Sequence, residues 1–345
     1  MINFTDISAV RLYDQFTKVK LIDNAKYIRL MKSRQSQFDV TNTVNVTDSQ
    51  AVCNAVCDIF HSCYLSADDS VICQAFEDFD NLFEGHYSGF NACDTYYHDK
   101  QHTLDMTLAL ARLIDGHERQ SDRVHTFGAK LTSVSIITAL FHDSGYIRKA
   151  DDHEHINGAQ YTAIHVSRSA TFLSNYLQMI GMPEFANIAA NMVHYTGYEV
   201  APDQIKLPDE KLHLLGYMIG TADLIAQMSD RCYLEKCKDR LFLEFELAGM
   251  TRSQNEENDS AILFKSAIDL LIKTPEFYNT GVKNRLNHLF KEVYKYAEAH
   301  FGNGNLYLEY LTQNITHIES LISSNQLQKL KRLPPENPGI KAFLK

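Results

Sequence analysis

The clearest indication of the fold is the stretch LTSVSIITALFHDSG at residues 131–145, where an apolar segment runs directly into a His-Asp pair and a glycine. Its large apolar residues at helical spacing are Leu131, Ile136, Ile137 and Leu140. This spacing predicts a buried helix that ends close to Gly145. A carboxylate at the end of a buried helix is costly unless it is paired or bound to a cation, so His142 and Asp143 indicate metal ligation. An ordinary polar helix terminus is the alternative.

Helical periodicity continues on both sides of this stretch and predicts an all-α protein. The segments that carry the pattern are 8–33, 50–64, 67–84, 104–113, 157–180, 184–195, 209–230, 258–273, 280–300 and 305–330. A weak alternation of apolar and polar residues at 38–46 is the one strand-like run in the sequence. We therefore expect a bundle of helices that share one core.

The candidate chemistry divides the chain into three predicted regions. Residues 1–90 hold no recognisable site and are expected to form an N-terminal helical extension. Residues 91–240 contain the metal-binding catalytic core, and residues 241–345 form C-terminal helices and a tail that pack on it. The tail from Arg332 contains three of the seven prolines. Helix should therefore stop there, and an extended, docked segment should follow.

Composition and charge limit the kinds of partner. The 345-residue chain has 45% hydrophobic and 22% charged residues, which is typical of a compact protein. Its formal net charge of -10 argues against long nucleic acids and anionic membranes, because both require clustered Lys and Arg. No leader pattern opens the sequence and no apolar run approaches the roughly 18 residues of a membrane helix. We expect a cytoplasmic protein that acts on a small molecule.

The seven cysteines form an odd set without CxxC spacing. They are Cys53, Cys57, Cys63, Cys73, Cys93, Cys232 and Cys237. This pattern indicates neither a disulfide framework nor a structural zinc knuckle. We expect buried, reduced thiols that behave as small hydrophobic residues.

Five further polar residues lie in apolar surroundings. His98 and His102, in YYHDKQH, are four residues apart, so both imidazoles lie on one helix face. His165 lies within an amphipathic segment, His194 follows an apolar one, and Asp223 interrupts the apolar run MIGTADLIA. Taken singly, each is as compatible with a hydrogen-bonded core residue as with a ligand.

Taken together, six side chains on apolar helical surfaces supply imidazole nitrogens and carboxylate oxygens, the donors that divalent transition metals prefer. The predicted ligands of a first ion are His102, His142, Asp143 and Asp223. Those of a second ion are Asp143, His165 and His194. We therefore expect two divalent ions, with Mn, Ni, Mg, Zn or Fe as candidates, and open positions for water and substrate.

The order His, His-Asp and a later Asp resembles the HD superfamily of metal-dependent phosphohydrolases over residues 97–230. The stretch YHDKQH at 97–102 is also similar to the His-Asn-x-x-His entry motif of cyclic nucleotide phosphodiesterases, which implies that His98 is the general acid. His165 and His194 resemble the two-metal branch of the superfamily, which includes the HD-GYP cyclic-dinucleotide phosphodiesterases. The resemblance implies an HD-domain helical bundle with a binuclear metal centre.

A two-metal centre would activate water near neutral pH and neutralise phosphoryl oxygens. His98 and the bridging Asp143 are the predicted catalytic residues. A substrate phosphate also calls for protein cations. The candidate substrate-binding residues are Arg168, on the helical face of His165, and Arg148, Lys149 and Tyr146 in the connector after His142-Asp143.

The expected function is a metal-dependent phosphohydrolase or phosphodiesterase that hydrolyses a small phosphate ester, with nucleotides and cyclic nucleotides among the candidates. A mixed-valence di-iron oxygenase is one alternative, because such oxygenases have a similar set of four His and two Asp. A non-catalytic nucleotide sensor is another. The expected partner is a small phosphorylated substrate rather than long nucleic acid or a membrane, and a homodimer stays open.

Overall fold

A computed structural model describes residues 34–122, 124–251 and 264–337. The chain divides between Gln35 and Ser36, and the account below concerns the unit that begins at Ser36. Within the described residues the fold is all-α, as predicted, and β-pairing is limited to isolated bridges such as Phe38 with Asn45. The predicted helix at 8–33 and the first part of the predicted 258–273 helix lie outside the described residues.

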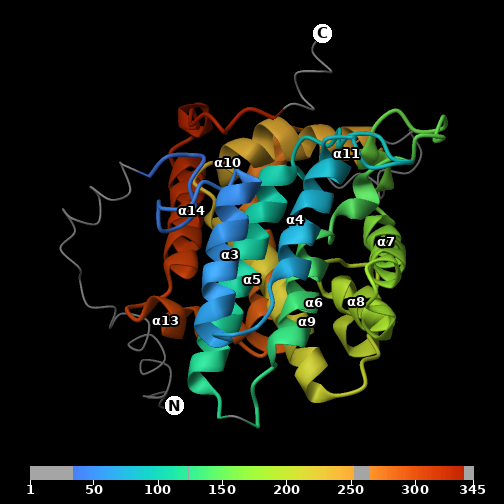
Figure 1. The fold of residues 1–345 in the computed structure, drawn as a ribbon. Helices are drawn as coiled ribbons and strands as arrows, with labels where there is room; N and C mark the ends of the chain where they lie inside the picture. Colours follow the sequence, from blue (N-terminus) through green and yellow to red (C-terminus); the bar gives the residue numbers. More distant parts are fainter. Residues whose placement is uncertain (1–33, 123, 252–263, 338–345) are drawn as a thin grey trace, which may run out of the picture. The chain divides into compact units, whose positions relative to one another are not determined.

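The helices of this unit agree with most of the predicted segments (Figure 1). Their bounds are α3 Ser49–Cys63, α4 Ser70–Phe83, α5 Lys100–Gln120, α6 Ala129–Leu140, α7 His165–Met179, α8 Ala186–Met192, α9 Glu210–Ser229, α10 Tyr233–Lys236, α11 Phe242–Leu247, α12 Ala267–Phe277, α13 Tyr296–Phe301 and α14 Leu306–Ser323. None of the described helices is long and apolar enough to cross a membrane.

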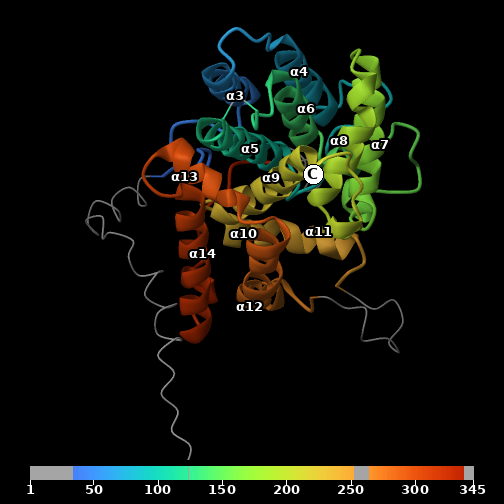
Figure 2. The same cartoon turned by 90° about the horizontal axis from the view of Figure 1, so that it is seen from below.

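Helices α5 and α9 pack against each other at the centre of the unit. Every residue of α5 from Gln101 to His117 is buried, so this helix is covered on all sides. Figure 2 shows α3 and α4 on one side of α5, α6 and α9, and α10, α12 and α14 on the other. Because the central helices have no solvent face, their polar residues must find partners inside the protein.

Side-chain caps explain where several helices begin. Asp48 caps α3 by accepting hydrogen bonds from the backbone N–H groups two and three residues on, and Asp209 caps α9 through the N–H of Leu212. Asp99 caps α5 by accepting from the backbone N–H of His102 at 3.0 Å. Such caps satisfy backbone donors that the first helical turn leaves unpaired. The cap on α5 therefore also fixes the backbone of a predicted metal ligand.

Two predicted helices are interrupted. The segment 157–180 begins with a 3-10 turn at Gly158–Tyr161, and α7 starts only at His165. The segment 280–300 is broken at Lys291 and Glu292, which adopt left-handed conformations with φ of 52° and 58°. A left-handed residue cannot continue a right-handed helix, so apolar periodicity alone overestimated this helix.

The described part of the predicted N-terminal extension packs directly on the segment that follows it, because α3 contacts α5 and α4 contacts α6. The described part of the tail, residues 332–337, has no helix and is docked on the unit, as predicted. The side-chain amide of Asn337 donates to the carbonyls of Thr95 (3.3 Å) and Tyr96 (2.9 Å), and Arg240 donates to the carbonyl of Pro335. The tail therefore holds the segment that leads into α5.

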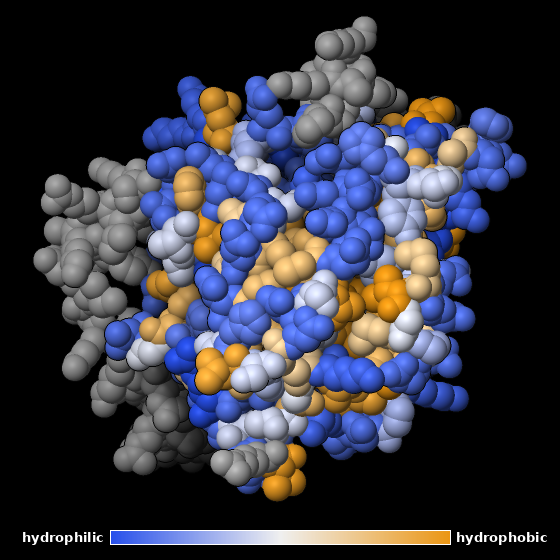
Figure 3. Space-filling view, in the orientation of Figure 1, coloured by the Kyte–Doolittle hydropathy of each residue, from blue (hydrophilic) through white to orange (hydrophobic). Residues whose placement is uncertain are grey.

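The face that carries α3 and α4 is mostly hydrophilic (Figure 3). Hydrophobic side chains reach the surface in the middle of this face, along the seam between the two helices.

Candidate metal centre

Three donor groups from separate elements meet at the centre of the unit. His102 lies in the first turn of α5, His142 follows the end of α6, and Asp223 lies in α9. Their donor atoms all lie within 4.8 Å of one another. His102 Nε2 is 3.2 Å and His142 Nε2 is 4.0 Å from Asp223 Oδ1. All three residues are buried, so the structure forms a group that can hold a metal ion.

Asp143 adds a second carboxylate to this group. Its Oδ2 is 3.1 Å from His142 Nε2 and 3.5 Å from His102 Nε2, and its Oδ1 is 3.9 Å from His165 Nε2. Three imidazoles therefore face one carboxylate, an arrangement in which Asp143 can bridge two ions. We call His102, His142, Asp143 and Asp223 the histidine–aspartate cluster.

The imidazoles of His142 and His165 are oriented so that Nδ1 faces a backbone carbonyl and Nε2 faces the Asp143 carboxylate. The Nδ1 of His142 lies 2.8 Å from the carbonyl oxygen of Ala139, and the Nδ1 of His165 lies 2.7 Å from that of Thr162. A carbonyl can only accept, so both Nδ1 atoms carry the proton, and in the neutral ring Nε2 has a lone pair. Metal-binding histidines are oriented in this way by their second nitrogen.

The cluster is left unsatisfied by the protein. His142 Nε2 and Asp143 Oδ2 are both buried without a hydrogen-bond partner. A lone pair that faces a carboxylate at 3.1 Å is repulsive unless a proton or a cation lies between them. The residues therefore fit a bound divalent cation.

Without a metal, protons would have to neutralise the cluster. Burial disfavours the charged imidazole of His142, but the adjacent Asp143 carboxylate outweighs burial and raises the pKa of His142 to about 9. Burial likewise disfavours ionised Asp143, and the neighbouring imidazoles, His142 foremost, reverse this and lower the pKa of Asp143. Each group thus favours charge on the other, and a divalent cation supplies the same neutralisation.

A close backbone approach places His165 beside the cluster. A Cβ atom on Gly145 would lie 1.8 Å from the carbonyl oxygen of His165, so only glycine fits there. The backbone N–H of Gly145 also donates to Ser169 Oγ at 2.8 Å. The segment after Asp143 can therefore lie directly against the start of α7. Burial lowers the pKa of His165, which keeps the ring neutral for ligation.

His194 is less closely tied to the cluster. It lies in the 3-10 helix Val193–Tyr195, its Nδ1 is buried without a partner, and burial lowers its pKa. Its imidazole makes no hydrogen bond or ion pair with any residue in the described ranges. Gly220 lets this segment approach α9, because a Cβ there would lie 2.4 Å from the carbonyl oxygen of Tyr195. The assignment of His194 to a second ion stays a prediction.

His98 stands next to the cluster with one ring nitrogen engaged. Its Nδ1 lies 2.6 Å from Oε2 of the buried Glu244, whose Oε1 accepts from the backbone N–H groups of Tyr97 and His98. Burial opposes protonation, but the Glu244 carboxylate outweighs it and raises the pKa of His98 to about 9. The imidazole is therefore protonated at neutral pH, and Nε2 is the atom that can donate to a ligand.

The four predicted substrate-binding residues have partners within the protein. Arg168 Nε donates to the carbonyl oxygen of Gly145 at 2.6 Å, and Arg148 Nε donates to Asp94 at 2.9 Å. Tyr146 is buried and stacks on both His98 and His165, with ring centroids 4.5 Å and 4.3 Å apart. Lys149 is held by its backbone, which bridges to that of Phe90. A role of these residues in substrate binding stays a prediction.

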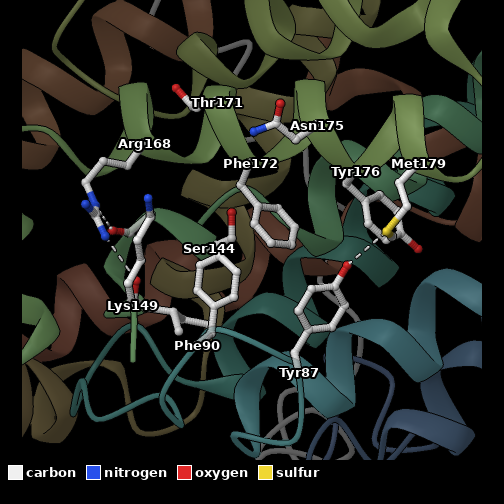
Figure 4. A pocket seen from close by; sticks show the side chains of 12 residues that line it. Tyr87, Phe90, Ser144, Lys149, Arg168, Thr171, Phe172, Asn175, Tyr176 and Met179 are labelled. Carbon is white, nitrogen blue, oxygen red and sulfur yellow. Dashed lines mark hydrogen bonds between the residues drawn. The ribbon is translucent and has the colours of Figure 1, made fainter. Parts of the chain in front are cut away.

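An aromatic pocket of about 320 Å³ lies beside the segment that follows Asp143 (Figure 4). The rings of Tyr87, Phe90 and Phe172 line its middle, while Arg168 and Lys149 lie at one end. None of the predicted metal ligands lines it. Arg168 and Lys149, two of the predicted substrate-binding residues, thus line this pocket rather than the histidine–aspartate cluster.

Sequence reasoning missed three residues around the site. Glu244 binds His98, and Gln227 Nε2 donates to Asp223 Oδ1 at 3.2 Å. Arg285 is 4% exposed, and its Nη1 has no hydrogen-bond partner. Its guanidinium lies 3.9 Å from the centre of the Tyr198 ring. The spacing of Gln227, four residues after Asp223, was a usable signal, whereas nothing local marks Glu244 or Arg285.

Comparison with known proteins gives one match. The model of a family described as Npun_R2479-like matches residues 150–320. This range contains Asp223 and both histidines predicted for a second ion, while His102 and the His142-Asp143 pair precede it. No curated protein matches the chain. The function is therefore argued from the chemistry of the site.

Proposed function

We propose that the protein is a metal-dependent phosphohydrolase or phosphodiesterase of the HD type, which hydrolyses a small phosphate ester at the histidine–aspartate cluster. The observation that carries this proposal is the unsatisfied pair of His142 Nε2 and Asp143 Oδ2, buried and 3.1 Å apart. Proteins rarely leave such atoms unpaired without a functional reason. A site-bound cation gives both atoms a partner.

The cluster and its neighbours supply ligands for two ions. One ion takes the cluster, and a second takes Asp143 together with His165 and His194. When bound, the ions make hydroxide available from water near neutral pH and neutralise the oxygens of a phosphoryl group. Gln227 orients the Asp223 carboxylate, and the Asp99 cap fixes the backbone of His102. Such supporting contacts preserve ligand geometry.

His98 is the proposed general acid. Glu244 holds its Nδ1, so Nε2 is left to donate a proton to the oxygen that leaves phosphorus. Stacking on Tyr146 sets the plane of the ring beside His165. An alkoxide is a poor leaving group, and protonation in the transition state removes this barrier.

Arg285 is the proposed cation for the substrate phosphate. Its Nη2 donates to the carbonyl of Gly197, three residues after His194, and its charge interacts with Asp223. Because Nη1 has no partner, the guanidinium retains a donor for a phosphate oxygen. Arg148, in contrast, directs Nε and Nη2 to Asp94 and Nη1 to the carbonyl of His155, so each of its three nitrogens already has a partner.

The test is purification without added metal, elemental analysis, and a chromatographic screen of nucleotides, cyclic nucleotides and sugar phosphates for hydrolysis. We expect metal in the wild type and turnover of at least one phosphate ester, and we expect His142→Ala to lose both that turnover and the metal held by the histidine–aspartate cluster. Iron with oxygen-dependent turnover would overturn the proposal in favour of an oxygenase. Metal and nucleotide binding without any turnover would overturn it in favour of a sensor.

A further inference from the structure

Three thiols gather at the seam between α3 and α4, away from the histidine–aspartate cluster. Cys53 and Cys57 are four residues apart on α3, so they share one face of that helix. Cys73 lies on α4, which packs against α3. The three Sγ atoms all lie within 4.8 Å of one another, and those of Cys57 and Cys73 are 3.9 Å apart.

This spacing is that of sulfur ligands around one ion. Two thiolates bound at about 2.3 Å in a tetrahedral site are separated by roughly 3.8 Å. The observed 3.9 Å between Cys57 and Cys73 is close to that value, and all three cysteines are free. The side chains therefore need little movement to bind a single ion. Soft sulfur donors select Zn²⁺, Cu⁺ and similar cations over Mg²⁺ or Mn²⁺.

The three thiols are enclosed on one side and accessible on the other. Cys53 is 4% and Cys57 is 8% exposed, whereas Cys73 is exposed at the surface of α4. Hydrophobic side chains reach the surface along this same seam (Figure 3). An ion can therefore enter beside Cys73 and reach two shielded sulfurs, which leaves one position for water or an external ligand.

Local charge also favours a cation. The carboxylates of Asp69 and Asp80 are near enough to interact electrostatically with Cys53. Asp80 is neutralised by Lys100, whose Nζ lies 2.8 Å from Oδ1. Asp69 pairs only with His61, at 3.4 Å, and that histidine is itself partly exposed. Negative charge near the thiols is therefore left for an incoming cation.

We infer that Cys53, Cys57 and Cys73 form a second metal site, which binds one thiophilic d¹⁰ cation such as Zn²⁺ or Cu⁺ between α3 and α4. Binding replaces up to three S–H protons by metal–sulfur bonds and releases the protons to solvent. No oxidant or reductant is consumed. Because the ligands belong to two helices, the bound ion links them and stabilises their packing.

The experiment uses the full chain, reduced and metal-free, titrated with Cd²⁺ as the probe. Cadmium bound to thiolates gives an ultraviolet sulfur-to-metal charge-transfer band, which nitrogen and oxygen ligands do not give. We expect the band to reach the amplitude of one thiolate-bound Cd²⁺ per chain in the wild type and in His142→Ala, whatever cadmium the histidine–aspartate cluster also takes up, which keeps the test independent of the proposed function. Bound cadmium should also protect Cys53, Cys57 and Cys73 from alkylation, as mapped by mass spectrometry.

The variant is Cys73→Ser, whose side chain is exposed and whose folding is checked by circular dichroism. We expect its band to fall by at least tenfold at one equivalent. Cys93→Ser is the matched control, because this cysteine contacts Thr95 elsewhere in the unit, and it should behave as the wild type. A band of full amplitude in Cys73→Ser, or no band in the wild type, would overturn the inference.

Discussion

Two buried aspartates, Asp115 and Asp143, lie in clusters built from the same kinds of side chain. Asp115 is 1% and Asp143 is 3% exposed. Asp115 Oδ2 accepts from Arg119 Nε at 2.7 Å and from His300 Nδ1 at 2.6 Å, and its Oδ1 accepts from Ser62 Oγ at 3.1 Å. Every lone pair that needs a donor has one, so this carboxylate links α3, α5 and α13.

Asp143 also faces imidazoles, but with the opposite outcome. His142 and His165 donate hydrogen bonds from Nδ1 to backbone carbonyls, so the nitrogen that faces the carboxylate is Nε2, which has a lone pair in the neutral ring. Asp143 Oδ2 is left without a donor. A buried Asp-His contact is therefore structural when the protein supplies the protons, and a candidate metal site when the protein withholds them.

The largest effect is expected from removing a predicted metal ligand of the histidine–aspartate cluster. His142→Ala and Asp143→Asn should each lose the bound metal and lose turnover entirely, because no other described group supplies the missing donor. Elemental analysis and a hydrolysis assay measure both losses. Asp115→Asn is the matched control and should retain metal. Full metal content in Asp143→Asn would remove the distinction between the two aspartates.

The next largest effect is expected from substituting His98, the proposed general acid beside the histidine–aspartate cluster. His98→Gln should lower kcat by roughly 10²–10⁴-fold, the usual contribution of a positioned general acid. Turnover requires protonated His98, so wild-type activity should decline as pH rises through the pKa of His98, about 9. Glu244→Gln removes the anion that raises this pKa, and the decline should move to lower pH. An unchanged alkaline limb in Glu244→Gln would contradict the assignment.

A smaller effect is expected from substituting Arg285, the proposed cation for the substrate phosphate. Arg119 donates to Asp115 through Nε, whereas the buried Nη1 of Arg285 has no hydrogen-bond partner. Arg285→Gln should raise KM for the phosphate substrate by roughly 10–100-fold, since each tenfold corresponds to about 1.4 kcal/mol. Steady-state kinetics test this, with Arg148→Gln as the control. Equal effects in the two variants would exclude a specific role for Arg285.

Metal removal should destabilise the wild type by about 2.7 kcal/mol if metal had been present at 100 times its Kd. In His142→Ala the same chelator should remove only an ion held by the three cysteines, so the double variant His142→Ala, Cys73→Ser should show no change in stability. Adding Cys73→Ser to the wild type and to His142→Ala separates the loss of stability at the histidine–aspartate cluster from any loss at the three cysteines. Thermal denaturation with and without chelator provides the measurement, and identical Tm values for the treated and untreated wild type would contradict a bound metal.

The smallest effect is expected from substituting Asp115, whose carboxylate has hydrogen-bond donors within the protein. Asp115→Asn should lower the free energy of unfolding by about 1–3 kcal/mol, the cost of leaving buried donors without their acceptor, while metal content and kcat stay at wild-type values. Its neighbours lower the pKa of Asp115 in the folded protein. The stabilisation is therefore present above the unfolded pKa and is lost as pH falls through the folded value. Chemical denaturation at two pH values tests the sign.

The parts of the site that the sequence predicted share a local cause. A carboxylate that ends an apolar helix, as Asp143 does, or interrupts one, as Asp223 does, is recognisable because burial of a charge is costly wherever the helix packs. His102 was recognisable from its spacing of four residues from His98, which places both imidazoles on one helix face. The helix at 280–300 was overestimated because the left-handed residues Lys291 and Glu292 leave the apolar period intact.

Contacts across the fold could not be predicted. Glu244 is 146 residues from His98, and no local pattern pairs them. The group of Cys53, Cys57 and Cys73 could not be predicted from the sequence for the same reason. The thiol of Cys73 lies near that of Cys57 only because α4 packs on α3. Spacing rules detect ligands within a helix or a short loop, while ligands on two packed helices can lie at any separation in sequence.

The amino-acid sequence alone determined the all-α class and the burial of His142, Asp143 and Asp223, because both follow from helical periodicity and the cost of burying charge. Tertiary structure determined which of those side chains receive protons. His142 faces Asp143 with a lone pair, whereas His300 faces Asp115 with a donor, because each ring orientation depends on a hydrogen-bond partner placed by packing.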